Sequence, residues 1–222
     1  MQVIAELLTP DEVARIRAII AAGPWEAGAA TAGHLAQRAK ANAQLAAASP
    51  AAADAGAIVR AALDRSPAFL AAALPRTVLP PLFSRYAPGE AYGPHVDNAL
   101  RRSGSGWVRT DLSVTLFLSP PESYEGGALL IADGAASHRV KLPAGTAILY
   151  PADTIHQVEP VGAGERLAAV IWVESLVGDA AARRILLELD GAVQQLGDHP
   201  SALRLTGIYH NLLRRWAGSR AP

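Results

Sequence analysis

The spacing of apolar residues predicts a helix near the start of the chain. Thr9 is expected to cap it, Pro10 occupies its first turn, and Glu12 completes a Thr-x-x-Glu capping box. The pair Gly23-Pro24 ends the pattern. Apolar side chains then recur at helical spacing, at Val13, Ile16, Ile19 and Ile20.

The next part of the chain is rich in alanine and less clearly patterned. Residues 33–49 are polar and predict a loop or a poorly determined strand. Residues 51–73 predict a second helix, which Pro75 ends. Its candidate core contacts are Ile58, Leu63, Phe69 and Leu70.

From about residue 77 the pattern changes to short β-like runs separated by Gly and Pro turns. About eight strands of this length can form a jelly-roll of two facing sheets. The runs are residues 77–79, 82–86, 111–118, 128–132, 138–142, 146–150, 155–159 and 166–174.

After Gly178 the helical spacing returns, with a break at His199-Pro200, which predicts a C-terminal helical hairpin. The expected fold is therefore mainly β with flanking helices: a double-stranded β-helix (jelly-roll) core preceded by N-terminal helices. We expect one catalytic domain over residues 1–177 and a helical subdomain over 178–222. An uncovered apolar face on the hairpin would favour a homodimer.

Composition narrows the class of protein. Half of the residues are hydrophobic, and 20 basic residues balance 20 acidic ones, so no global field attracts nucleic acid or an anionic membrane. There is no cysteine, hence no disulfide framework and no thiolate site. Neither a signal peptide nor a membrane-spanning apolar run is evident. These features predict a soluble cytoplasmic protein.

His95, Asp97 and His156 are candidate metal ligands. Alternate residues of a strand point the same way, so His95-x-Asp97 offers two ligands on one face, and His156 can supply the third from a distant strand. Two imidazoles and a carboxylate match the facial triad of non-haem Fe(II) oxygenases. The alternative is a chance His-x-Asp pair.

The other histidines give weaker evidence of a functional role. His138 lies in an alternating, solvated run, and His210 lies on the last predicted helix as a surface or packing residue. His34 and His199 fall in loops without an identifiable partner.

Arg166 opens an apolar run that predicts a strand buried on both faces. A guanidinium in a core needs an anion, and a bound dicarboxylate would satisfy it through paired hydrogen bonds. The alternatives are an ion pair within the protein or a side chain that reaches water.

Together these residues resemble a known family. The order His95-x-Asp97, Gly126-Gly127, His156, Arg166 is similar to that of the prolyl-4-hydroxylase-like 2-oxoglutarate/Fe(II) dioxygenases, and more closely to the bacterial PKHD-type hydroxylases. The likeness covers nearly the whole chain. It is carried by residues 73–77, 81–86, 92–97, 109–113, 115–119, 123–127, 138–145, 149–151, 187–190 and 209–214.

The resemblance implies Fe(II) at His95, Asp97 and His156, and the distal carboxylate of 2-oxoglutarate at Arg166. It also implies L-ascorbate as a reductant. It makes Tyr86 a catalytic candidate, and Tyr92 is a second one, although either ring can equally be a core aromatic. Family members are often associated with iron acquisition.

Pro94 and residues 40–44 limit what the resemblance carries over, and residues 98–107 leave two alternatives open. Pro94 stands where a bulkier residue is common and is expected to stiffen the pocket entrance. Residues 40–44 resemble a polar family segment that can line the pocket, but we expect a plain solvated loop. Residues 98–107 are either a lid over the site or a disordered surface loop.

The resulting hypothesis is a dioxygenase that hydroxylates a C–H bond while 2-oxoglutarate is decarboxylated to succinate. A non-catalytic sensor of iron or 2-oxoglutarate with the same fold is one alternative. A cupin-like enzyme that uses Zn or Mn without a keto acid is another. The substrate stays open between a free amino acid, a peptidyl side chain and a siderophore-like small molecule.

Overall fold

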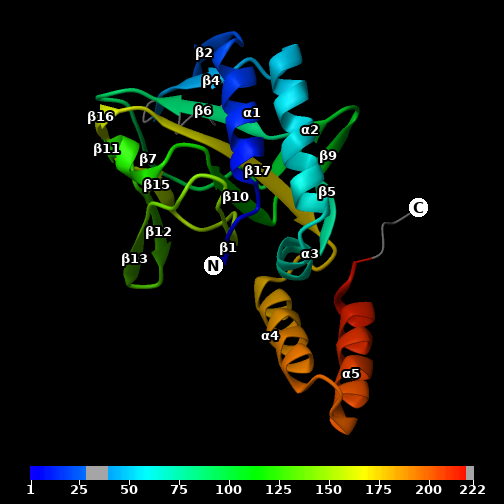
Figure 1. Ribbon diagram of the computed structural model, residues 1–222. Coiled ribbons are helices and arrows are strands. Elements are labelled where there is room, and N and C mark those ends of the chain that lie inside the picture. The colour runs from blue at the N-terminus through cyan, green and yellow to red at the C-terminus, as the bar shows by residue number, and fades with distance from the viewer. Residues whose placement is uncertain (29–39, 219–222) are drawn as a thin grey trace.

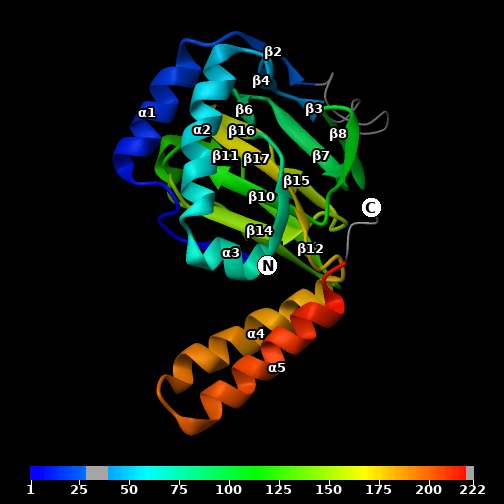
Figure 2. The ribbon, with the colours of Figure 1, turned by 90° about the vertical axis from the view of Figure 1, so that its right-hand side faces the viewer.

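The computed structural model of the chain describes residues 1–28 and 40–218. Two β-sheets form the core, with helices on the outside of the larger sheet and a helical hairpin beyond it (Figures 1 and 2). The helices are α1 (Pro10–Ala21), α2 (Pro50–Asp64), α3 (Pro67–Ala73), α4 (Ala180–Leu196) and α5 (Pro200–Trp216), with a short 3-10 turn at Pro121–Ser123.

The larger sheet has eight strands. Its strands, in spatial order, are β1 (Gln2–Ile4), β14 (Ala147–Pro151), β10 (Leu112–Phe117), β17 (Arg166–Ser175), β6 (Leu82–Tyr86), β4 (Ala43–Leu45) and β2 (Trp25–Ala27), and β5 (Pro75–Val78) also pairs with β17. All of these pairings are antiparallel.

The smaller sheet faces the larger one. Its order is β13 (Ala136–Val140), β12 (Leu129–Asp133), β15 (His156–Val158), β7 (Ala91–His95) and β3 (Lys40–Ala41). Side chains from both sheets form one cluster between them, which includes Phe117 and Tyr150 from the larger sheet and Leu129 and Val158 from the smaller. Two separate pairs complete the β structure: β11 (Tyr124–Gly126) with β16 (Val161–Gly164), and β8 (Leu100–Ser103) with β9 (Gly106–Arg109).

The central strand β17 shows how the sequence builds these layers. Alternate residues point to opposite faces, so Leu167, Ala169 and Ile171 pack outward against α1 and α2. Arg166 and Trp172 point inward, toward the smaller sheet. The strand is buried on both faces, as its apolar run predicts.

The N-terminal helices confirm one prediction and correct another. The capping box is formed: the backbone N–H of Glu12 donates to the Thr9 hydroxyl, and the Glu12 carboxylate accepts from the backbone N–H of Thr9. The single helix expected over residues 51–73 is wrong. It is divided into α2 and α3, because Pro67 cannot continue α2 and Ser66 caps a new helix instead.

Other corrections concern polar segments. For residues 33–49 the sequence left a loop or a poorly determined strand open, and the described part, residues 40–49, contains β3 and β4, while residues 33–39 lie outside the described residues. Residues 98–107 are not a disordered loop: they form most of the β8–β9 hairpin. The expected strands did not include β1, β2, β11 or β16, and β7 was expected only as the strand that carries His95 and Asp97.

The predicted C-terminal hairpin is present and projects away from the β core (Figures 1 and 2). At its base, Leu186 of α4 belongs to a small cluster with Val177 and Leu74, against which Leu212 and Trp216 of α5 pack. Elsewhere in α5, Leu203 and Ile208 are exposed, Leu203 most of all. No helix of the described part is long and apolar enough to cross a membrane.

Candidate active site

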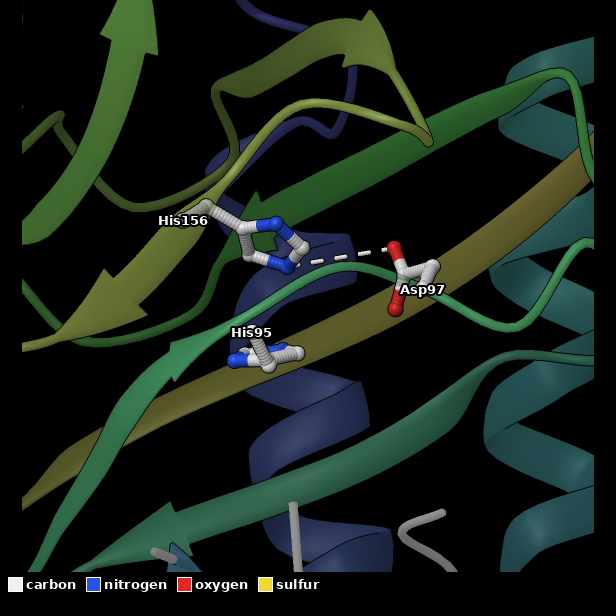
Figure 3. Close-up of side chains that lie close together, drawn as sticks. All are labelled: His95, Asp97 and His156. Carbon is white, nitrogen blue, oxygen red and sulfur yellow. Dashed lines mark ion pairs between the residues drawn. The ribbon is translucent and has the colours of Figure 1, made fainter. Parts of the chain in front are cut away.

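Strands β7 and β15 bring the two candidate histidines together. His95, the last residue of β7, lies directly opposite His156, the first residue of β15. Asp97 follows two residues after His95. One potential ligand atom from each of the three lies within 4.8 Å of the others (Figure 3). The structure therefore brings the predicted triad together.

Both imidazoles are oriented by backbone carbonyls. His95 Nδ1 lies 2.9 Å from Gly93 O, and His156 Nδ1 lies 2.9 Å from Thr154 O. When Nδ1 carries the proton, Nε2 is left with a lone pair for a metal. Burial, with the neighbouring His156, lowers the pKa of His95 to about 4, so His95 is neutral at neutral pH.

Asp97 is held by contacts outside the strand that carries His95. The strand ends at His95, so the expectation that both ligands lie on one strand is only half correct. The backbone N–H of Asp97 donates to Ala152 O at 3.1 Å, and the Ser113 hydroxyl donates to the Asp97 carboxylate. Asp97 Oδ2 lies 3.8 Å from His156 Nε2. These contacts keep the carboxylate beside the imidazoles.

The two predicted tyrosines occupy different environments. Tyr92 lines the same pocket as the triad, and its ring stacks on that of His95 with 3.6 Å between centroids. Tyr86 lies in the cluster between the sheets, with its ring 5.2 Å from the Arg166 guanidinium carbon. Burial raises the pKa of Tyr86 to about 12 and raises that of Tyr92 too, so both hydroxyls are protonated at neutral pH.

Arg166 is buried in the same pocket. Its side chain is 2% exposed, which excludes the alternative that it reaches water. Within residues 1–28 and 40–218, its Nε and Nη2 have no hydrogen-bond partner and it forms no ion pair. Buried donors are nearly always paired. The unpartnered N–H groups therefore mark a place where an anion can bind.

Gly127 lets the chain pass close to Arg166. It has a φ of +60°, and a Cβ there would lie 3.2 Å from Arg166 Cδ and 3.1 Å from a ring carbon of Tyr124. The Tyr124 hydroxyl is itself buried with no partner in the described structure. The second glycine of the Gly126-Gly127 motif thus gives Arg166 and Tyr124 the room to lie together.

The pocket also contains residues outside the predicted site. Lys40 and Gln44 line it, so the expected solvated loop at residues 40–44 is wrong and the alternative, a segment that lines the pocket, holds. Arg101 of β8 also lines it, with its guanidinium carbon 3.7 Å from the ring centre of Trp172. Other missed lining residues are Ser84, Thr115, Tyr150 and Trp172. Period-two alternation within the buried strands is the signal that could have found these last four.

The remaining described histidines lie away from the triad. His138 is exposed and its Nε2 lies 3.2 Å from the Asp133 carboxylate, in agreement with a solvated strand. His199 caps α5 through its Nδ1, which accepts from the backbone N–H of Ser201. His210 is exposed on α5. His34 lies outside the described residues.

Comparison with known proteins agrees with this geometry. Residues 81–174 match the 2OG-Fe(II) oxygenase superfamily, and residues 180–218 match the PKHD-type hydroxylase C-terminal domain. A PKHD-type hydroxylase of Phenylobacterium zucineum is 51% identical to this chain, and the similarity covers 96% of this chain and 97% of the relative. One from Xanthomonas campestris pv. campestris is 49% identical over the same shares.

Solved structures show the same fold. A Pseudomonas putida prolyl-4-hydroxylase superposes with a TM-score of 0.52 at 22% identity, over 78% of this chain and 91% of that one. A Trichoplax adhaerens prolyl hydroxylase in complex with a hypoxia-inducible-factor peptide fragment gives 0.56 at 17% identity, over 83% and 86%. The chain belongs to the PKHD-type hydroxylases of the 2OG-Fe(II) oxygenase superfamily and is a 2-oxoglutarate-dependent hydroxylase.

Proposed function

We propose that His95, Asp97 and His156 hold Fe(II), and that Arg166 binds the distal carboxylate of 2-oxoglutarate. The observation that carries this proposal is the buried Arg166 side chain, whose Nε and Nη2 lack a partner in the described structure, in the pocket that also contains the triad. A cation in such a place is costly unless an anion meets it. A dicarboxylate that also reaches the metal satisfies both ends of the pocket.

The donor set fits Fe(II). Two neutral imidazoles and one carboxylate are ligands of intermediate and hard character, and three protein ligands leave positions for a co-substrate. The contacts of Nδ1 with Gly93 and Thr154 fix the ring orientation, and Ser113 orients the carboxylate of Asp97. Bound there, iron and 2-oxoglutarate would supply the oxidation chemistry, with succinate and carbon dioxide as products.

The chain's own contribution is to position these groups and exclude water. Leu129, Val158 and Val170 supply apolar wall around the polar groups of the pocket. Burial raises the pKa of Tyr150, whose hydroxyl therefore remains a neutral donor beside Thr115, 3.4 Å away. Tyr86 and Tyr92 stay proposed active-site residues, Tyr86 next to Arg166 and Tyr92 against His95.

The substrate is proposed to be a small molecule or a peptidyl side chain, and the structurally similar Trichoplax enzyme was solved with a peptide. L-Ascorbate is the expected reductant, and a link to iron uptake rests on the resemblance alone. We further propose that residues 1–177 form the catalytic unit and that residues 178–222 are an appended hairpin, available for dimer formation.

Anaerobic titration tests the site directly. Addition of Fe(II) and then 2-oxoglutarate to the metal-free protein should produce a visible charge-transfer band. Arg166→Gln should shift the titration to higher 2-oxoglutarate concentrations. Arg85→Gln is the matched control, because Arg85 lies on the neighbouring strand and pairs with Glu165 at 3.7 Å.

A band that never appears, or an Arg166→Gln variant that titrates like the wild type, would overturn the proposal. Succinate release under air then separates turnover from the non-catalytic binding protein considered from the sequence. The measurement needs no knowledge of the substrate, because 2-oxoglutarate oxygenases of this kind can be followed through their co-substrate.

A further inference from the structure

Strand β7 has one residue more than its partner strand between two paired positions. Tyr92 pairs with Val158 of β15, and His95 pairs with His156, so three steps along β7 correspond to two steps along β15. An extra residue of this kind is a β-bulge, which bends the strand and changes the direction of nearby side chains. We call the stretch between the two paired positions, Gly93-Pro94, the β7 bulge.

The β7 bulge determines which side chains of the strand face the pocket. In a regular strand, residues three apart point to opposite faces, so Tyr92 and His95 would lie on different sides of the smaller sheet. In the structure both line the pocket. The extra residue therefore brings the Tyr92 ring to the face that carries the candidate metal ligand.

Pro94 accounts for the position of the bulge. Proline has no backbone N–H to donate to a neighbouring strand, and within sheets it is confined to edges and bulges. Strand β7 lies between β15 and β3 in the smaller sheet, so Pro94 in a regular ladder would interrupt its hydrogen bonds. The sequence thus favours a bulge directly before His95.

Two contacts from this stretch define the orientation of His95. The Tyr92 ring stacks on the imidazole with 3.6 Å between centroids and 18° between planes. His95 Nδ1 lies 2.9 Å from the carbonyl oxygen of Gly93, which belongs to the bulge. The stacking fixes the plane of the imidazole, and the contact with Gly93 fixes which edge of the ring Nδ1 occupies. A ligand held in this way loses little rotational freedom when a metal binds.

His156 is restrained differently. It is 5% exposed, its Nδ1 lies 2.9 Å from Thr154 O, and Tyr150 meets it edge-on with 5.1 Å between ring centroids. His95 is less buried and is the last residue of its strand. The Tyr92 ring therefore supplies to His95 the restraint that burial supplies to His156.

We propose that Tyr92 is a positioning residue: its ring, brought beside His95 by the β7 bulge, holds the imidazole in the orientation that a metal needs before the metal binds. This inference rests on the proposed function, because it takes His95 as a metal ligand. The role belongs to the ring of Tyr92 and not to its hydroxyl. Phenylalanine should therefore replace Tyr92 in this role, whereas an aliphatic residue should not.

Binding of Co(II), used in place of Fe(II), measures this effect without turnover. Calorimetry gives the dissociation constant, and the visible d–d bands report the geometry of the bound ion. Tyr92→Leu should raise the dissociation constant about tenfold and shift the bands, because the His95 ring is no longer held. Tyr92→Phe should match the wild type in both. Tyr209→Leu is the matched control, because Tyr209 also lies beside a histidine, with 5.4 Å between its ring centroid and that of His210, but on α5.

Proton NMR of the metal-free wild type provides a test that needs no variant of Tyr92. An aromatic ring stacked on His95 should shift the imidazole protons of His95 upfield from those of the exposed His138. The His95→Gln spectrum identifies these resonances by their disappearance. An upfield shift supports a stack that exists before the metal binds.

The outcomes separate the role of the ring from metal binding itself. Unshifted His95 resonances, wild-type affinity in Tyr92→Leu, equal losses in Tyr92→Leu and Tyr92→Phe, or an equal loss in Tyr209→Leu would each overturn this inference while leaving the metal site intact. Unchanged Co(II) bands in Tyr92→Leu, together with a lower melting temperature of the metal-free protein, would also overturn it, because they describe a general loss of structure. Wild-type protein that binds no Co(II) would overturn the proposed function, and this inference with it.

Discussion

Two arginines are buried in the described part of the molecule, and their surroundings differ. Arg183 lies where α4 leaves the β core, and its Nη1 donates to the carbonyl oxygens of Val177 at 2.6 Å and Gly178 at 2.8 Å. Arg166 lies in the pocket, with Nε and Nη2 unpartnered among the described residues. The two side chains are therefore similarly buried but differ in whether the protein supplies acceptors for their N–H groups.

The difference shows which feature of a buried charge indicates binding. Both side chains lose water, a cost that must be offset by hydrogen bonds. The protein itself meets the needs of Arg183, so that residue fixes the base of the hairpin. The Nε and Nη2 donors of Arg166 have no partner among the described residues, so unpartnered donors, rather than burial alone, mark the proposed co-substrate site.

The sharpest test of this contrast is Arg166→Gln. We expect the dissociation constant for 2-oxoglutarate to rise about a hundredfold, because a buried, charge-assisted pair is lost. The midpoint of thermal unfolding without ligand should stay the same or rise, because an unpartnered buried charge is removed. Calorimetric binding and thermal melts measure both. A large loss of apo stability would show that Arg166 is structural like Arg183.

Arg183→Met should give the opposite result. Removing the donor leaves the carbonyls of Val177 and Gly178 without a partner, so the free energy of unfolding should fall by about 2 kcal/mol. The affinity for 2-oxoglutarate should not change. Denaturant unfolding and the same binding assay check this. If Arg183→Met bound 2-oxoglutarate more weakly without any loss of stability, Arg183 would not be the purely structural arginine of the two.

Gly127→Ala examines the space that Arg166 needs. The new methyl group would meet Arg166 Cδ and Tyr124 at a backbone position with positive φ. We expect 2-oxoglutarate affinity to fall about tenfold, from a strain of roughly 1–2 kcal/mol at this position. The control is Gly134→Ala, since Gly134 has a φ of +59° but nothing within 4 Å of the added carbon. Equal losses in both variants would attribute the effect to backbone strain alone.

Tyr124→Phe should have the smallest effect. The Tyr124 hydroxyl is buried, which raises its pKa against the lowering effect of the neighbouring Arg166, and it forms no hydrogen bond of normal geometry in the described structure, so a bound carboxylate is its natural acceptor. Its loss should weaken 2-oxoglutarate binding about fivefold, the value of one hydrogen bond, without lowering apo stability. Tyr209→Phe, on α5, serves as the control. If Tyr124→Phe left the affinity for 2-oxoglutarate unchanged, Arg166 alone would bind the distal carboxylate.

The sequence predicted the surroundings of a residue best where they depend on a single strand. The apolar run after Arg166 indicated a strand buried on both faces, and the structure has that strand as β17. The position of His156 at a strand start is likewise confirmed. Local pattern suffices in such cases, because alternation and burial are properties of a single segment.

The part of the pocket that Lys40 and Arg101 line was harder to predict, because it depends on pairing between distant segments. Strand β3 has two residues, too few for an alternating pattern, and its place beside Tyr92 is set by pairing with β7. Arg101 belongs to an exposed hairpin whose sequence resembles a loop. The positions of Lys40 and Arg101 in the pocket are therefore set by how β3, β7, β8 and β17 are arranged in space.

The opposition of His95 and His156 across two strands has a mechanical consequence. The pairing of β7 with β15 is irregular, with a register shift between His156 and Val158. An ion coordinated by both imidazoles would act as a cross-link between these strands, much as a disulfide joins two segments. Backbone amides of β7 and β15 should then exchange with deuterium more slowly in the metal-loaded protein, so the cell's iron supply would govern the rigidity of this sheet as well as catalysis.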